Sequence, residues 1–231
     1  MEFNWFDHAF VFLIVVVIPL MSLRSSIVST EIIESLPPKK HLFYTNGLIL
    51  IIGAMLVLTS WNFSGRPWAN LGFSLISWSD HVMLLCIGIF IFYFADLVVG
   101  FLNSKYIKSR LDDLHYIIPL NWNEFISYIF LAVSAGICEE VIFRGFLITY
   151  LSHYFSGMPY GQILAILIPA LVFSVSHLYQ GWWAVLKIMI LAMLFGFIFV
   201  LSESLIAAII IHILIDIFSG VAGVLSHKNA S

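Results

Sequence analysis

The chain has 231 residues and a formal net charge of −3; 61% of its residues are hydrophobic and only 10% are charged. This composition excludes an ordinary soluble domain, in which about a quarter of the residues are charged. The slightly acidic balance also excludes a basic surface for nucleic acid. We therefore expect a membrane protein whose partner is the lipid bilayer, with no nucleic-acid partner.

Long apolar runs recur along the chain, each close to the roughly 20 residues that a bilayer-spanning helix needs. They predict an all-α fold, a polytopic membrane helix bundle with about seven transmembrane helices. The first run is expected to be a retained helix, because no Lys or Arg precedes it as in a cleaved signal peptide. In chain order the predicted spans are 9–23, 43–61, 82–102, 126–150, 162–179, 184–202 and 204–225.

The basic residues predict how the bundle lies in the membrane. With seven spans and the N-terminus outside, eight basic residues fall on one side, Arg66 falls on the other, and Arg144 is within a span. Cytoplasmic loops carry the excess of Lys and Arg, so we predict a multi-pass cell-membrane protein with an outside N-terminus and a cytoplasmic C-terminus. The eight residues are Arg24, Lys39, Lys40, Lys105, Lys108, Arg110, Lys187 and Lys228.

The connecting segments and the third span carry weaker signals. The aromatic segment 61–81 is expected to rest on the outer interface, and segment 103–124 is expected to contain a short interfacial helix. Asp96 lies in the third span. It is either a structural hydrogen-bond partner or a residue near the inner interface.

The fourth span contains 138-CEEVIFRG-145, with Glu139, Glu140 and Arg144 in an otherwise apolar run. One charged side chain at the bilayer centre costs roughly 2.5–3.5 kcal/mol on the insertion scale, so such residues indicate function. On a helix, Glu140 and Arg144 are four residues apart and can pair. Glu139 is rotated by about 100° from Glu140, which leaves it free to act as a general base.

Two later spans carry further ionisable residues. The fifth has 173-FSVSH-177 with His177, and the last has 212-HILID-216, where His212 and Asp216 share one helix face. Glu139, His212 and Asp216 are expected near mid-membrane and His177 somewhat closer to the inside. His177 alone could equally make a packing hydrogen bond, but the similar depths predict one buried, water-filled site.

These residues resemble the motifs of the CPBP intramembrane proteases, the Abi or CAAX-protease family, which includes the type II endopeptidase of prenylated CAAX proteins. EEVIFRG resembles the EExxxR motif, Phe173 with His177 the FxxxH motif, and His212 with Asp216 the HxxxN/D motif. The three occur in the order of the family. The resemblance implies three parts, which are N-terminal transmembrane helices with their loops at 1–115, a CPBP-like catalytic bundle of the last four helices at 116–225, and a short cytoplasmic tail at 226–231.

The resemblance implies an endopeptidase that acts on a membrane-embedded or lipid-anchored peptide or protein. It implies roles in CAAX-type processing or in bacteriocin maturation and immunity; the sequence does not identify the substrate or say whether it is prenylated. By similarity, Glu139 activates the attacking water and His177 holds that water or shares its proton. Glu140 and Arg144 orient and balance the site, while His212 and Asp216 stabilise the oxyanion. Asp216 departs from the asparagine of the CAAX-cleaving members, so His212 is the expected donor and Asp216 its orienter.

Alternatives to this hypothesis remain open. The resemblance favours a metal-free glutamate mechanism without a cofactor, but zinc is the alternative, with Glu139, His177 and His212 as ligands. The buried charges could also serve a non-catalytic membrane scaffold or the proton relay of a proton-coupled transporter. An inactive relative that binds a membrane partner is a further possibility.

Overall fold

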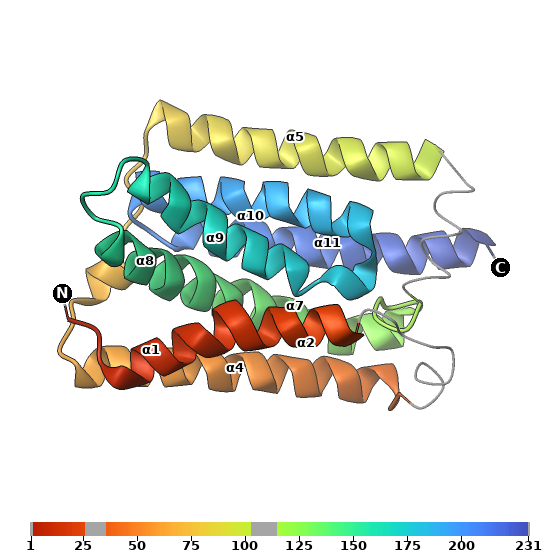
Figure 1. Cartoon of the computed structure of the whole chain (residues 1–231). Helices are drawn as coiled ribbons and strands as arrows, with labels where there is room; N and C mark the ends of the chain where they lie inside the picture. The colour runs from red at the N-terminus through yellow and green to blue at the C-terminus, as the bar shows by residue number, and fades with distance from the viewer. Residues whose placement is uncertain (1, 26–35, 103–114, 231) are drawn as a thin grey trace.

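The computed structural model describes residues 2–25, 36–102 and 115–230, and within these ranges it is all-helical without a strand. Figure 1 shows the helices lying side by side as a bundle, with the two chain termini at opposite ends. The predicted helix-bundle fold is therefore confirmed. The elements are α1 (Trp5–Phe12), η1 (Leu13–Val17), α2 (Ile18–Ser25), α4 (Lys39–Phe63), η2 (Trp68–Leu71), α5 (Asp80–Leu102), α7 (Trp122–Glu139), η3 (Glu140–Ile148), α8 (Thr149–Tyr154), α9 (Gly161–Val175), η4 (Leu178–Gln180), α10 (Trp182–Ser202) and α11 (Ile206–Ala230).

Six helical stretches of the described chain are long and apolar enough to cross a membrane. The one remaining predicted span, the fifth, corresponds to α9, an apolar helix of 15 residues with Pro169 inside it. The spans are Trp5–Arg24, Lys39–Phe63, Asp80–Val99, Trp122–Tyr154, Trp182–Ser202 and Ile206–Lys228. The predicted fifth span, 162–179, is too long at its C-terminal end, because the helix ends at Val175 and the chain then turns through η4.

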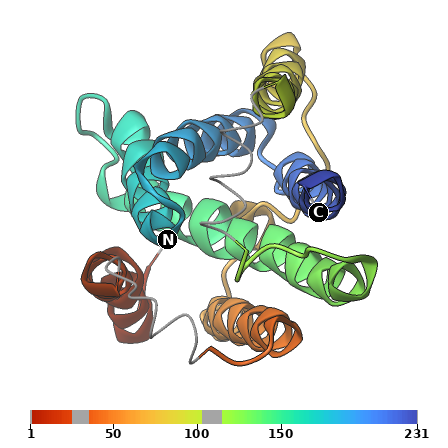
Figure 2. The same ribbon diagram turned by 90° about the vertical axis from the view of Figure 1, so that its right-hand side faces the viewer.

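The helix that carries the glutamates lies inside the bundle. Seen end-on in Figure 2, α7 lies between α4 and α11, and it packs against both. Helix α5 lies at the edge and contacts α10 and α11. Close packing against α11 depends on Gly136, where an added Cβ would lie 2.4 Å from Ile213 Cγ1 and 3.0 Å from the Ile213 nitrogen.

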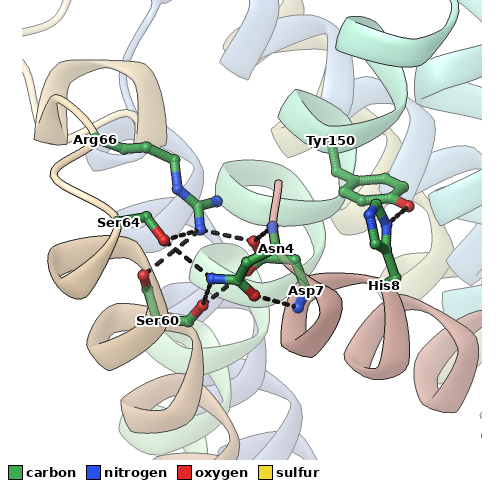
Figure 3. Close-up of polar contacts among 7 residues, drawn as sticks. All are labelled: Asn4, Asp7, His8, Ser60, Ser64, Arg66 and Tyr150. Carbon is green, nitrogen blue, oxygen red and sulfur yellow. Dashed lines mark hydrogen bonds and ion pairs between the residues drawn. The ribbon is translucent and has the colours of Figure 1, made fainter. Parts of the chain in front are cut away.

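A polar cluster, which we call the N-terminal clasp, joins α1 to the end of α4 and consists of Asn4, Asp7, Ser60, Ser64 and Arg66 (Figure 3). Arg66 Nη2 lies 2.7 Å from Asp7 Oδ2, and both side chains are almost fully buried. The Asn4 amide donates to the hydroxyls of Ser60 and Ser64, and Asn4 and Asp7 form a capping box at the start of α1. The clasp therefore fixes the first helix to α4 at the end of the bundle that holds the N-terminus.

The segment after α4, which the sequence predicts to rest on the outer interface, also packs on the protein. Arg66 and Leu71 are buried within the protein, and the backbone oxygen of Asn70 accepts a hydrogen bond from Thr149 Oγ1. An added Cβ on Gly145 would lie 2.7 Å from the Leu71 oxygen, so this segment packs directly on η3. The expected interfacial helix within 103–124 lies mostly outside the described residues.

Candidate active site

The two glutamates lie where the fourth spanning helix changes its hydrogen-bonding pattern. Helix α7 ends at Glu139, and η3 continues from Glu140 to Ile148 as a π-helix before α8 begins. All nine residues of η3 are buried. Single π-turns within α-helices are frequent at functional sites, and the sequence, interpreted as a continuous α-helix, did not predict this one.

Glu140 and Arg144 form the ion pair that their spacing predicts. Arg144 Nη1 donates to Glu140 Oε1 over 3.0 Å, and the two side chains are 2% and 0% exposed. The second guanidinium nitrogen, Nη2, contacts the backbone oxygen of Ala192 on α10 at 3.5 Å. Arg144 therefore links the carboxylate of its own helix to the backbone of another helix.

His212 connects both glutamates to the last helix. Its Nδ1 lies 2.7 Å from Glu140 Oε1, within hydrogen-bond distance. Its Nε2 lies 3.7 Å from Glu139 Oε2 and 3.8 Å from Asp216 Oδ2. The close partner of the ring is thus Glu140, whereas the sequence had suggested that Asp216 orients it.

Distances of 3.7 and 3.8 Å are too long for direct hydrogen bonds, so Nε2 faces a polar gap between the two carboxylates. The gap is bordered by Glu139, His212 and Asp216, the three residues that the sequence places near mid-membrane. Glu139 is 13% exposed and Asp216 is 27% exposed, whereas Glu140 is fully buried. Glu139 is therefore the more accessible of the two glutamates.

His177 lies beyond the end of α9, in the turn before η4, rather than inside a span. Its Nδ1 lies 2.8 Å from the backbone oxygen of Phe173. A carbonyl oxygen only accepts, so Nδ1 carries the proton, and Nε2 of the neutral ring is an acceptor. Among the residues that the structure describes, His177 makes no ion pair with either glutamate.

The Phe173 ring joins the three motifs. It lies 4.7 Å from the His177 ring, 6.4 Å from the His212 ring and 4.9 Å from the Phe143 ring, measured between centroids. The Arg144 guanidinium carbon lies 5.0 Å from the Phe173 centroid. The six predicted site residues are thereby brought to one region, with Glu139, Glu140, Arg144, His212 and Asp216 in one connected set and His177 attached through Phe173.

Helix α10 contributes contacts that the sequence analysis missed. Phe195 stacks on the His212 ring at 5.7 Å and also lies 5.3 Å from the Arg144 guanidinium carbon. No polar residue marks this part of α10, so an inspection of ionisable residues could not find it. Nearer the start of the helix, Lys187 pairs with Asp96 of α5, which makes Asp96 an ion-pair partner outside the site.

The site residues do not form a zinc centre in this arrangement. Within the described residues, no three His, Cys, Asp or Glu side chains gather closely enough to hold a metal ion. Each histidine uses Nδ1 for another hydrogen bond, with Glu140 or with the Phe173 carbonyl, so only the Nε2 atoms remain as possible ligand atoms. Zinc needs ligand atoms at about 2.0–2.2 Å in a tetrahedral set, so the alternative ligands Glu139, His177 and His212 do not fit it as they stand.

Comparison with known families gives one match. Residues 121–218 match the family described as type II CAAX prenyl endopeptidase Rce1-like, in agreement with the resemblance to CPBP proteases. The matched segment begins at the N-cap of α7 and contains all six predicted site residues. No curated protein and no solved structure matches the chain.

Proposed function

We propose that the protein is a glutamate-dependent intramembrane endopeptidase, because residues 121–218 match the family described as type II CAAX prenyl endopeptidase Rce1-like. Its substrate is a membrane-embedded or lipid-anchored protein or peptide. The cleavage serves CAAX-type processing or bacteriocin maturation and immunity. One observation carries the proposal: His212 bonds Glu140 while its Nε2 faces Glu139 across 3.7 Å. The attacking water is placed beside this pair, within hydrogen-bond reach of Glu139.

In this mechanism Glu139 is the general base. It takes a proton from the water, whose oxygen attacks the carbonyl carbon of the scissile peptide bond. As the tetrahedral intermediate collapses, the C–N bond breaks and Glu139 returns the proton to the leaving amine. His177 presents an acceptor nitrogen that can hold the same water, because its Nδ1 proton is used by the Phe173 carbonyl.

His212 supplies the oxyanion donor. The protonated ring donates from Nδ1 to Glu140 and from Nε2 into the gap, where the oxyanion develops. Glu140 pairs with this ring and with Arg144, and its one negative charge offsets only part of their combined positive charge. Asp216 borders the gap and limits the direction in which Nε2 can point.

Substitution of the base tests the proposal most directly. Purified protein in proteoliposomes should cleave a membrane-anchored peptide, and Glu139→Gln should lower that rate by about 10²–10⁴-fold. Glu203→Gln is the matched control, because Glu203 is exposed at the turn between α10 and α11, outside the site. Undiminished cleavage by the Glu139 variant would remove Glu139 from the mechanism.

Peptides with and without a prenyl group, compared in the same assay, define the substrate class.

We propose further that the reaction needs no metal. The side-chain spacing supports this, because no three His, Cys, Asp or Glu side chains of the described residues gather closely enough to hold a metal ion. Protein treated with a strong chelator should keep its activity and hold no stoichiometric zinc by elemental analysis. Activity that is lost on chelation and restored by zinc alone would contradict the metal-free mechanism.

We also propose that the N-terminus lies outside and the C-terminus in the cytoplasm. The basic residues support this orientation: Arg24 ends α2, Lys39 begins α4, and Lys228 lies near the end of α11. These helix ends lie at the same end of the bundle, opposite the N-terminus (Figure 1). Lys105, Lys108 and Arg110 lie outside the described residues.

A further inference from the structure

Helix α10 carries no ionisable residue near the site, yet one of its side chains touches two charged members of it. Phe195 is 4% exposed and lies on the buried side of α10. The Phe195 and His212 rings are nearly parallel, with an interplanar angle of 19° and a centroid distance of 5.7 Å. The Arg144 guanidinium carbon lies 5.3 Å from the same Phe195 ring.

Arg144 lies against two aromatic rings. Phe173 of α9 is 5.0 Å from its guanidinium carbon, and Phe195 of α10 is 5.3 Å from it. An aromatic face attracts a guanidinium, and more strongly where water is excluded. The Ala192 oxygen, one turn before Phe195, contacts Arg144 Nη2 at 3.5 Å. One turn of α10 therefore contacts the guanidinium twice. The Ala192 oxygen contacts its edge and the Phe195 ring lies against its face.

Both neighbours of Phe195 donate to one atom. Arg144 Nη1 and His212 Nδ1 converge on Glu140 Oε1, at 3.0 and 2.7 Å. The hydrogen bond to Glu140 fixes one end of the imidazole but leaves its plane free to turn about that bond. A stacked ring restricts this rotation, and the plane decides whether Nε2 points into the gap beside Glu139.

We propose that Phe195 is a positioning residue of the protease: its ring sets the imidazole plane of His212 and keeps Arg144 on Glu140. This inference rests on the proposed function, in which His212 Nε2 donates to the oxyanion. Phe195 does not touch the reacting atoms and acts through His212. The backbone of α10 is fixed at this point, because an added Cβ on Gly196 would lie 2.7 Å from Ile166 Cγ2 of α9.

The test compares two phenylalanines of α10 that lie one turn apart. Phe195→Leu should lower kcat by on the order of 10²-fold, as a small misplacement of a catalytic group does, with KM nearly unchanged. Phe199→Leu is the matched control, because Phe199 is also buried but makes no ring contact with the site residues among those described. Its kcat should stay near that of the wild type. Phe195→Tyr keeps the ring and should retain most of the activity.

A second readout is independent of catalysis. In protein labelled with ¹³C at the histidine Cε1, the His212 signal, assigned by its loss in His212→Asn, should carry the upfield shift of a stacked ring. Phe195→Leu should remove this shift, whereas Phe199→Leu should leave it. A wild-type signal without the shift, or one that Phe195→Leu leaves in place, overturns the proposal whether or not the protein is a protease.

The kinetic outcomes separate the two hypotheses. Equal losses of kcat in Phe195→Leu and Phe199→Leu would show a merely structural role and overturn the positioning role. If Glu139→Gln keeps full activity, the proposed mechanism fails. The histidine signal still shows whether the Phe195 ring lies against His212. If Phe195→Leu does not fold, Phe195→Met, a flexible apolar side chain without a planar ring, replaces it in both measurements.

Discussion

At the scale of single residues, Glu140 is the carboxylate that contacts two buried basic side chains at once. One oxygen, Oε1, accepts from both Arg144 and His212. The other oxygen, Oε2, is buried and has no hydrogen-bond partner in the part of the chain that the structure describes. Charges buried in this way are tolerated only as a set, because removal of one partner leaves the others uncompensated.

Arg144 and Glu140 should therefore be strongly coupled in stability. Arg144→Met or Glu140→Gln alone should lower the free energy of unfolding by about 3–5 kcal/mol, because each leaves a buried charge unpaired. The double variant should lose clearly less than the sum of the two. Denaturation in mixed micelles measures this, and additive losses would contradict the coupling.

The Lys187–Asp96 pair is the matched control. Its two side chains are 26% and 27% exposed, so this pair is far less buried than Glu140 and Arg144. Lys187→Met with Asp96→Asn should change the unfolding free energy by about 1 kcal/mol or less, as for other accessible ion pairs.

His212 and Asp216 should differ in their kinetic effects although they share a helix face. His212→Ala should abolish turnover and leave substrate binding nearly intact, since the lost interaction exists mainly in the transition state. Asp216→Asn keeps a polar group at the border of the gap and should retain much of the activity, whereas Asp216→Leu should not. An asparagine variant as inactive as the leucine variant would mean that Asp216 needs its charge.

At the scale of elements, the site depends on how closely α7 approaches α11. Gly136 lies one helical turn before Glu140, and Ile213 follows His212. The absent side chain at Gly136 lets the two backbones meet, because a Cβ there would lie 3.0 Å from the Ile213 nitrogen. The distance from Glu140 to His212 is therefore set by a residue that takes no part in the chemistry.

Gly136→Ala should separate these helices. Overpacking should cost about 1–3 kcal/mol of stability, and cleavage should fall because His212 moves away from Glu139. Gly88→Ala is the control: Gly88 lies in α5 with nothing within 4 Å of an added Cβ, so alanine should stabilise that helix by up to about 1 kcal/mol. Thermal unfolding and cleavage assays on both variants test this, and equal behaviour of the two would refute the role of the close approach.

The sequence predicted those parts of the site that depend on local spacing. Glu140 and Arg144 pair at i and i+4, and hydropathy identified six helices of spanning length. The bond from His212 to Glu140 joins residues 72 positions apart, so no local pattern encodes it. The π-turn at Glu140 changes the hydrogen-bond register without changing apolarity, and Phe195 resembles any other apolar residue of α10. Those features arise from packing between helices.

At the scale of the whole molecule, the site is surrounded by helices that meet from both halves of the chain. Helices α4 and α11 flank α7, and α1 is fixed to α4 by the N-terminal clasp. The first half of the chain, which carries no recognised motif, thus covers one side of the helix that carries the glutamates. His8 Nδ1 also lies 2.7 Å from the hydroxyl of Tyr150 on α8, which joins the first helix to the fourth spanning stretch (Figure 3).

The proposed orientation gives a direct prediction about topology. Reporter domains fused after residue 40 and after residue 110 should both report the cytoplasm, because the basic residues favour that side. A fusion after residue 65, near the N-terminal clasp, should report the outside. An outside signal from either of the first two fusions would overturn the seven-span arrangement.

The N-terminal clasp also has a consequence for biogenesis. Asp7 and Arg66 belong to the same end of the bundle but are synthesised on either side of two membrane crossings, so the ion pair closes only after α4 has inserted. Glu139, Glu140 and Arg144 follow Arg66 by more than 70 residues and are therefore synthesised later. Synthesis proceeds from the N-terminus. The first helix and α4, joined by the N-terminal clasp, can therefore be packed together before α7 leaves the ribosome. The costly charges of the later helix thus enter the bilayer beside a protein surface that is already in place.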